Sequence, residues 1–490
     1  MHTNAGHSIK IRGVDDVIAF VDSCSGIVGR AGFIWWIALG GLFLDALANS
    51  ALGVSLGMMS RDLHLDAAEI AIMTSSSSWV AIVFNPIGGW MADRWGRVRP
   101  LVFAKVCSLV GAVLVMFAPD LSAVLIGRFF AGMAYGIDFA IAMALLAEYT
   151  PAHLKSRINA WAGMWGVAGC LNLLLALMFY SWHVGDAIWR YSIGATAVFS
   201  ALILLLQVSF LVESPAWLAR KERVADAAAA MTRIYGRSFV AAPFDERVPV
   251  TNQARRGFAN VALIFRGIYL PRAILASTVQ TAQAIEYFAI GWYLPVISIT
   301  LFGTNFVHST LGALAFSVIG TICGFLSPVV GRVLGLRRAS AIGFLGVGAT
   351  LLVLGLYGTV MPMWMSLLVP SLFLVFHSAG PSANGKSLSS LSFRSELRAS
   401  ANGLVGALGS VGAAVGLLVF PIFREHYGLK HTYLMLAAVP LLASIVCFAI
   451  KWDPTRSPVN PDNEPDAPQF KRDEEVVSGF LSPAMNDGQR

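Results

Sequence analysis

The chain has 490 residues, of which 56% are apolar and only 13% are charged, and its mean hydropathy is +0.68. Ordinary soluble proteins are roughly 45–50% apolar and about 25% charged, so this composition excludes a soluble enzyme. The net charge of +7 therefore bears first on orientation in a membrane, and nucleic-acid binding is a weak alternative. At about 20 apolar residues per span, the chain can furnish on the order of twelve membrane helices.

Residues 1–32 contain several aspartates and lack a compact apolar core followed by a small-residue cleavage site. They are therefore interpreted as a cytoplasmic N-terminal segment and not as a cleavable signal. We expect an amphipathic helix in this segment, around Val14 to Val28.

Apolar runs between turn and charge signals predict twelve membrane helices. The first six lie near 33–59, 69–91, 101–118, 121–147, 158–180 and 190–212, and the second six near 272–301, 308–331, 339–358, 360–385, 399–424 and 431–451. They form an N-terminal six-helix bundle at 33–213 and a C-terminal six-helix bundle at 272–452. A cytoplasmic central loop at 214–271, with a helical piece at 224–234, joins them, and a Pro-rich tail at 453–490 is expected to be disordered. The fold class is an all-α membrane protein.

The positions of the cations indicate the orientation. With both termini on one side, that side receives all but five of the 35 lysines and arginines, Lys105 and Lys386 included. The exceptions are Arg61, Arg128, Arg190, Arg424 and Lys430. The positive-inside rule therefore places both termini in the cytoplasm.

The two halves repeat, and three motifs accompany the repeat. Residues 154–169 align on 397–412 with a leucine, a cation, an asparagine and three glycines in common. The motifs are G-G-W-M-A-D-R-W-G-R at 88–97, G-R-F-F-A-G-M-A-Y-G at 127–136 and E-S-P-A-W-L at 213–218. With these motifs the chain resembles the major facilitator superfamily, and within it the sugar porter and metabolite:proton symporter branch. The resemblance implies two pseudo-symmetric bundles that work by alternating access.

The resemblance also implies a cytoplasmic gate around the first motif, a latch that favours the outward-open state. Its candidate residues are Gly89, Asp93, Arg94, Gly96, Arg97, Glu148, Arg157, Glu213, Glu396 and Arg398. Carboxylates at helix amino termini, and arginines at carbonyls or acids of the facing half, would stabilise the latch. The alternative is that these charges only anchor helix ends in the headgroup region.

Placing an ionisable side chain inside a membrane costs roughly 2.5–3.5 kcal/mol on insertion scales. Ionisable residues within the predicted membrane helices are therefore candidates for a functional role. Asp45, Arg128, Asp138 and Glu286 are the candidates for proton coupling. Arg128 and Asp138 would lie about 15 Å apart along one helix, so Arg128 is predicted to pair with Asp45 across the bundle. The resemblance to proton-coupled sugar porters implies the same pair. The alternatives are a static ion pair and, for Asp138, hydrogen bonding between helices.

Polar and aromatic residues that share a helix face predict the substrate site. They are Gln280, Gln283, Tyr287, Asn49, Trp161, Trp165, Asn172, His377 and Asn384. Amides suit hydroxyls or carboxylates, and tryptophans suit the flat face of a sugar or aromatic ring. The alternatives are hydrogen bonding between helices for the glutamines, packing for the tryptophans and a buried core role for His377.

No nucleotide-binding loop, catalytic triad or metal-ligand cluster occurs in the sequence, and the five cysteines show no paired spacing. We therefore expect no enzyme, no metal, no disulfide and no cofactor, with a proton gradient as the energy source. The prediction is a proton-coupled importer of a small organic acid, aromatic acids included, with a sugar-like metabolite close behind. A proton-driven exporter of amphipathic compounds and a non-transporting membrane sensor are the alternatives. The expected partners are a small-molecule substrate, protons and the lipid bilayer, and we expect a monomer in the plasma membrane.

Overall fold

The computed structural model of the protein describes residues 8–242, 259–303, 305–358, 360–393 and 395–457, most of them in helices. The N-terminal half contains six long helices. They are α2 (Arg30–Asp62), α3 (Ala67–Trp95), α4 (Val98–Met116), α5 (Leu121–Tyr149), α6 (Trp161–Ser181) and α7 (Ile188–Phe210). Two short 3-10 helices, η1 (Ala152–Ala160) and η2 (Gly185–Ala187), precede α6 and α7.

The C-terminal half contains interrupted as well as continuous helices. Its elements are α11 (Tyr269–Glu286), the π-helical η3 (Tyr287–Gly291), α12 (Leu294–Phe302), α13 (Phe306–Leu334), α14 (Leu336–Tyr357), α15 (Met363–Ala379), α16 (Pro381–Ser392) and α17 (Ser395–Ala449). The segments α11, η3 and α12 make the seventh span, and α15 and α16 make the tenth. Gly428, with φ of 73°, interrupts α17 and divides it into two spans.

The described residues contain ten helices that are long and apolar enough to cross a membrane. One of the ten is the stretch that contains both parts of α17, and the broken seventh span is not among them. Dividing α17 into two spans and adding the broken seventh span gives the twelve spans that the sequence predicts. The largest boundary error is in the tenth span, which the sequence ends at residue 385 but which continues to Ser392.

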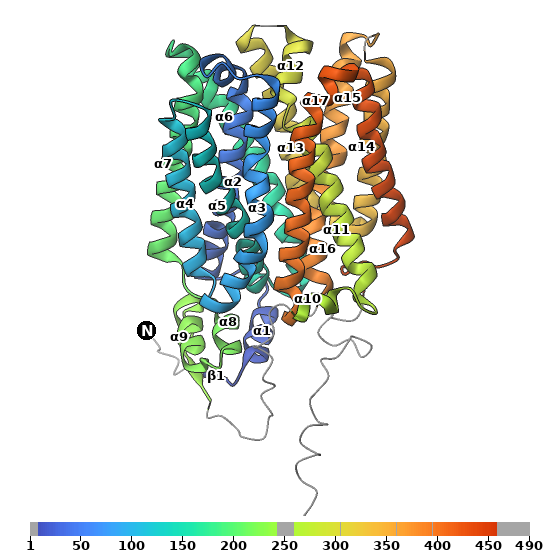
Figure 1. Ribbon diagram of the computed structural model, residues 1–490. Helices are drawn as coiled ribbons and strands as arrows, with labels where there is room; N and C mark the ends of the chain where they lie inside the picture. The colour runs from blue at the N-terminus through green and yellow to red at the C-terminus, as the bar shows by residue number, and fades with distance from the viewer. Residues whose placement is uncertain (1–7, 243–258, 304, 359, 394, 458–490) are drawn as a thin grey trace, which may run out of the picture.

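The two halves stand side by side, with α3 packed on α17 and α6 on α13 between them (Figure 1). Several short elements gather at one end of the bundle: α1 (Val14–Ser23), β1 (Ile9–Ile11), α8 (Pro215–Arg220), α9 (Val224–Tyr235), β2 (Phe239–Ala241) and α10 (Ala259–Ile264). We call this the α8 end. Helix α12 lies at the opposite end, which we call the α12 end (Figure 1).

The helices expected near residues 14–28 and 224–234 are present as α1 and α9. The sequence did not predict the parallel pairing of β1 with β2, in which Ile9 lies opposite Phe239. The ring of Phe20 in α1 packs edge-on against Tyr235 and Phe239, so the N-terminal segment is tied to the central loop. Residues 243–258 of that loop and 458–490 of the expected tail lie outside the described residues.

Glycines allow the close helix contacts that frame the site. A Cβ on Gly132 of α5 would lie 2.5 Å from the Ser77 carbonyl oxygen of α3. A Cβ on Gly324 of α13 would lie 2.8 Å from the Gly163 backbone nitrogen of α6, across the interface between the halves. Small residues at such contacts let backbones approach without an intervening side chain.

Candidate functional site

Three buried side chains form an ionic cluster inside the N-terminal half, which we call the acid centre. The Lys105 ammonium of α4 lies 3.3 Å from Asp45 Oδ1 of α2 and 2.8 Å from Asp138 Oδ2 of α5. It also donates to the Gly41 carbonyl oxygen at 3.1 Å. Gly41 leaves room for the cluster, because a Cβ there would lie 3.0 Å from Asp138 Oδ2. The acid centre thus contains two carboxylates and one cation, all fully buried.

The predicted pair of Asp45 with Arg128 is wrong. Arg128 donates instead to α3, to the carbonyl oxygens of Met73 (3.2 Å) and Thr74 (2.8 Å) and to the Ser77 hydroxyl (2.7 Å). The sequence prediction failed because it counted Lys105 as a loop cation. Helix α4 already begins at Val98, so at 1.5 Å per residue Lys105 lies about 10 Å into the helix.

Each carboxylate of the acid centre keeps one free oxygen. Among the described residues, Asp45 Oδ2 and Asp138 Oδ1 are buried without a hydrogen-bond partner. Both amide atoms of the neighbouring Gln207 are also unpartnered, and its Nε2 lies 3.4 Å from the Cβ position of Gly41. Unsatisfied buried acceptors are costly, so these two oxygens are exceptions that call for an explanation.

A cavity of about 90 Å³ lies between the two halves. Tyr135 and Phe139 of α5 and Trp161 and Trp165 of α6 line it from the N-terminal half. The C-terminal half contributes Gln280, Gln283, Tyr287, Gly320, His377 and Lys386, among others. Trp165 Nε1 donates to the Tyr287 hydroxyl at 3.2 Å, which links the two walls. The cavity therefore combines aromatic faces, two amides and one ammonium group.

Six of the nine predicted substrate residues line this cavity: Gln280, Gln283, Tyr287, Trp161, Trp165 and His377. The three asparagines do not. Asn49 donates to the Asp45 carbonyl of its own helix, and Asn172 donates to the Leu47 carbonyl and the Ser50 hydroxyl. Asn384 contacts Asn159 near the α8 end. Face periodicity placed these asparagines beside true lining residues, but the Asn49 amide binds its own helix and those of Asn172 and Asn384 bind neighbouring helices.

Lys386 is the charged residue of the cavity that the sequence prediction missed. It was assigned to a cytoplasmic loop, whereas α16 continues through it to Ser392. Its ammonium lies over the ring of Phe139 and 5.5 Å and 5.8 Å from the ring centroids of Trp161 and Tyr135. A prediction that the helix continues through residues 381–392 would have placed Lys386 inside the bundle.

Glu286 and His377 form a second buried pair, in the C-terminal half. His377 Nδ1 lies 2.8 Å from Glu286 Oε1, and the His377 ring stacks on Tyr287 with a centroid distance of 5.1 Å. Glu286 is the last residue of α11 before the π-helical η3. Such π-helical turns are frequent at functional sites. The predicted coupling residue Glu286 is therefore not adjacent to the acid centre but has its own partner beside the cavity.

The two halves contact each other on both sides of the cavity. Toward the α8 end, Asn159 of η1 donates to Asn384 Oδ1 (2.9 Å) and accepts from Ser387. Toward the α12 end, Trp292 Nε1 donates to the Asn49 carbonyl at 3.3 Å. The halves are therefore hydrogen-bonded to each other on both sides of the cavity.

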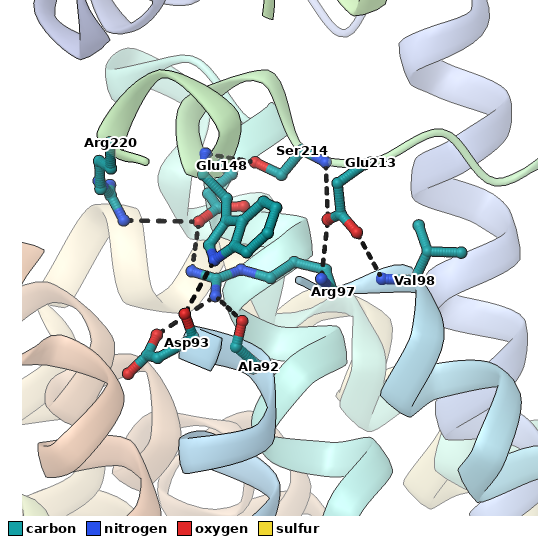
Figure 2. Close-up of polar contacts among 9 residues, drawn as sticks. Ala92, Asp93, Arg97, Val98, Glu148, Glu213, Ser214 and Arg220 are labelled. Carbon is teal, nitrogen blue, oxygen red and sulfur yellow. Dashed lines mark hydrogen bonds and ion pairs between the residues drawn. The ribbon is translucent and has the colours of Figure 1, made fainter. Parts of the chain in front are cut away.

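Three of the predicted gate residues, Asp93, Glu148 and Glu213, meet at Arg97 between α3 and α4 (Figure 2). The Arg97 guanidinium lies 2.9 Å from Glu148 and 3.2 Å from Asp93, and it donates to the Ala92 carbonyl. Burial alone would lower the pKa of Arg97, but Glu148 and Asp93 outweigh burial and raise it. Arg220 of α8 lies 3.8 Å from Glu148, so α8 takes part in the same network.

Glu213 binds the start of α4, as Figure 2 shows. Its carboxylate accepts from the backbone nitrogens of Arg97 (2.7 Å) and Val98 (3.3 Å), where a helix amino terminus favours negative charge. Gly96 has φ of 93°, and a Cβ there would collide with the Glu213 carboxylate. The glycine of the motif is therefore required by both its backbone angle and the approach of Glu213.

The Arg97 network lies within the N-terminal half and α8, not between the halves as expected. Among the other predicted gate residues, Gly89 is buried in α3, Arg94 lies over the Trp90 ring and Arg157 is exposed. Arg398 donates to the Phe393 carbonyl of its own half at 3.5 Å. The side chain of Glu396 lies outside the described residues. In this conformation asparagines and serines form hydrogen bonds between the halves at the α8 end.

Comparison with known proteins places this geometry in a family. The Major Facilitator Superfamily profile matches residues 38–376 and again residues 279–484. The inner membrane metabolite transport protein YgcS of Escherichia coli K12 is 25% identical over 419 residues, which cover 85% of this chain and 90% of that protein. The glucose transporter GlcP of Staphylococcus epidermidis is 25% identical over 425 residues, covering 85% and 92%. The galactose-proton symporter of Escherichia coli K12 is 24% identical over 324 residues, covering 64% and 68%.

The fold has solved counterparts. The proton:xylose symporter XylE bound to 6-bromo-6-deoxy-D-glucose superposes with a TM-score of 0.70 at 17% identity, covering 86% of this chain and 95% of that chain. A partially occluded inward-open form of the xylose transporter XylE from E. coli gives 0.69, also at 17% identity, covering 87% and 99%. These likenesses confirm the predicted two-bundle membrane fold, and the relatives are transporters and not enzymes. The chain belongs to the Major Facilitator Superfamily.

Proposed function

We propose that the protein is a proton-coupled symporter that imports a small polar metabolite across the plasma membrane by alternating access. The observation that carries the proposal is the acid centre, in which two buried carboxylates share one ammonium group. Burying two carboxylates costs free energy that only good partners offset, so such clusters inside membrane proteins mark ion or proton pathways.

The acid centre is close enough to the cavity for proton and substrate to influence each other. Asp138 directly precedes Phe139 in α5 and lies one turn after Tyr135, and both of these aromatic residues line the cavity. Protonation of Asp45 or Asp138 would weaken the ion pair with Lys105 and change the electrostatic potential in the cavity. Occupancy of the two sites is therefore linked, which is the requirement for coupled transport.

The arrangement of the halves supports alternating access. The cavity is lined from both halves, and the halves contact each other on both of its sides. Rocking one half against the other would break one set of contacts and preserve the other. The galactose-proton symporter among the relatives has the same coupling in its name, which supports protons as the coupling ion here.

The test uses the full chain reconstituted in liposomes that contain a pH-sensitive dye. Sugars and small organic acids are added outside one at a time, and protein-free liposomes correct for acids that cross the bilayer unaided. We expect at least one compound to acidify the interior only when the protein is present. Substrate entry without acidification would contradict proton coupling, and gradient-driven extrusion of amphipathic dyes with no uptake would favour the exporter.

A further inference from the structure

Lys386 points a positive charge at the cavity and has no carboxylate partner. It is 9% exposed, and no carboxylate of the described residues lies within ion-pair distance of its ammonium. Its surroundings are the rings of Tyr135, Phe139 and Trp161. Ring faces attract a cation only weakly compared with a carboxylate, so the ammonium keeps unused capacity to bind an anion.

The rest of the lining contains no competing charge. Besides Lys386, the lining residues are aromatic, aliphatic, glycine, serine, two glutamines and His377, and none is a carboxylate. Gln280 and Gln283 are the two amide side chains of the lining. The cavity therefore offers one cation, flat aromatic walls and two amides.

We propose that Lys386 binds the carboxylate of the substrate, and that the substrate is a small monocarboxylic acid with a planar ring or a compact hydroxylated skeleton. The ring packs against Trp161 and Trp165, and a hydroxyl contacts the Gln280 and Gln283 side chains that line the cavity. This deepens the proposed transport function and rests on it, because it names the substrate class of the same cavity.

Binding at Lys386 also explains how the substrate would bring the halves together. Lys386 belongs to α16 of the C-terminal half, whereas Tyr135, Phe139 and Trp161 belong to α5 and α6 of the N-terminal half. An acid held between the ammonium and these rings contacts both halves at once. Its binding therefore favours the closed arrangement over either open one.

The charge carried per cycle distinguishes an acid from a sugar. A monocarboxylate that enters with one proton moves no net charge, whereas a sugar that enters with one proton moves one positive charge. Uptake of an acid is therefore expected to respond to a pH gradient and not to membrane potential.

The experiment measures binding to the purified full chain in detergent by calorimetry, without any gradient. The probes are benzoate, 4-hydroxybenzoate and quinate, with benzamide and 4-hydroxybenzamide as neutral analogues, and xylose and myo-inositol as sugars. We expect at least one acid to bind about tenfold or more tightly than any neutral probe. Lys386→Met should weaken that acid about tenfold or more, while Lys386→Arg should stay within about threefold. Lys430→Gln removes an exposed lysine far from the cavity and is the matched control.

The inference is overturned if amides bind as well as acids, if Lys386→Met binds like the unchanged protein, or if no acid binds. Should Lys386→Met fail to fold, the comparison of each acid with its amide on the unchanged chain decides alone. Acids that bind but carry no protons into liposomes would contradict the proposed coupling and leave this inference standing. Sugars that bind and carry protons, with no acid bound, would support the proposed coupling and overturn this inference.

Discussion

Arg97 is held by two carboxylates that differ sharply in exposure. The Glu148 side chain is 9% exposed and the Asp93 side chain is 53% exposed, while that of Arg97 is 4% exposed. Breaking a buried ion pair from one side typically costs about 3–5 kcal/mol, against about 0–1 kcal/mol for an exposed one. The two acids of this network are thus unequal, although sequence position alone makes them alike.

We therefore expect Glu148→Gln to lower the thermal unfolding temperature in detergent and the initial uptake rate much more than Asp93→Asn does. Asp93→Asn is expected to slow uptake modestly, because Arg97 keeps Glu148 and the Ala92 carbonyl. Equal losses in the two variants at matched reconstituted amounts would show that exposure does not govern the network.

At the scale of single residues, the sequence predicts the acids better than it predicts their partners. Asp45, Asp138 and Glu286 stand out because carboxylates are rare inside apolar runs, and all three are buried. Lys105 and Lys386 lie within two turns of a predicted helix end, where a cation is normally assigned to the loop. Their burial depends on where α4 begins and α16 ends, and composition does not determine that.

Among the secondary-structure elements, η1 makes the closest polar contact between the halves. Asn159 reaches Asn384 and Ser387 of α16, and it lies 3.4 Å from the Ser327 hydroxyl of α13. A hydrogen bond contributes about 0.5–1.5 kcal/mol net, so the loss of these contacts changes a conformational equilibrium on the order of tenfold or more. These hydrogen bonds therefore stabilise the contact between the two halves at the α8 end.

Asn159→Ala is expected to shift the protein toward the state that is open at the α8 end. Spin labels at His153 and Arg332, both exposed, in a background without the five native cysteines, should show a larger population of long distances. Asn172→Ala is the matched control, because the partners of Asn172, Leu47 and Ser50, lie in the same half. An unchanged distance distribution for Asn159→Ala would show that the hydrogen bonds of Asn159 do not stabilise the state that is closed at the α8 end.

The elements themselves are largely readable from the sequence, since apolar runs of sufficient length have few alternatives in a bilayer. The exceptions have local causes. Seven of the residues from Pro381 to Ser392 are serine, asparagine or lysine, so α16 has no apolar signal although it packs between α11, α14 and α17. The β1–β2 pair joins segments more than two hundred residues apart, and no local pattern indicates that they meet.

At the scale of the whole molecule, the chemistry is divided between the halves. The acid centre lies entirely in the N-terminal half, whereas Lys386 and the Glu286–His377 pair lie in the C-terminal half. The proposed rocking of the halves would change the distance between Asp45 and Lys386 while the acid centre stays intact. Because the acid centre and Lys386 lie in different halves, we predict that loss of the acid centre uncouples transport from protons but does not abolish the movement of substrate across the membrane.

Asp45→Asn in proteoliposomes is the most direct test of this account, with Asp226→Asn on the exposed face of α9 as control. The substrate is whichever compound acidifies the dye-filled liposomes. Accumulation under an imposed inward proton gradient, and exchange of labelled for unlabelled substrate without a gradient, are measured on the same preparation. The account predicts that Asp45→Asn loses accumulation and retains exchange, while Asp226→Asn retains both. Accumulation by Asp45→Asn equal to that of the unchanged chain would contradict it.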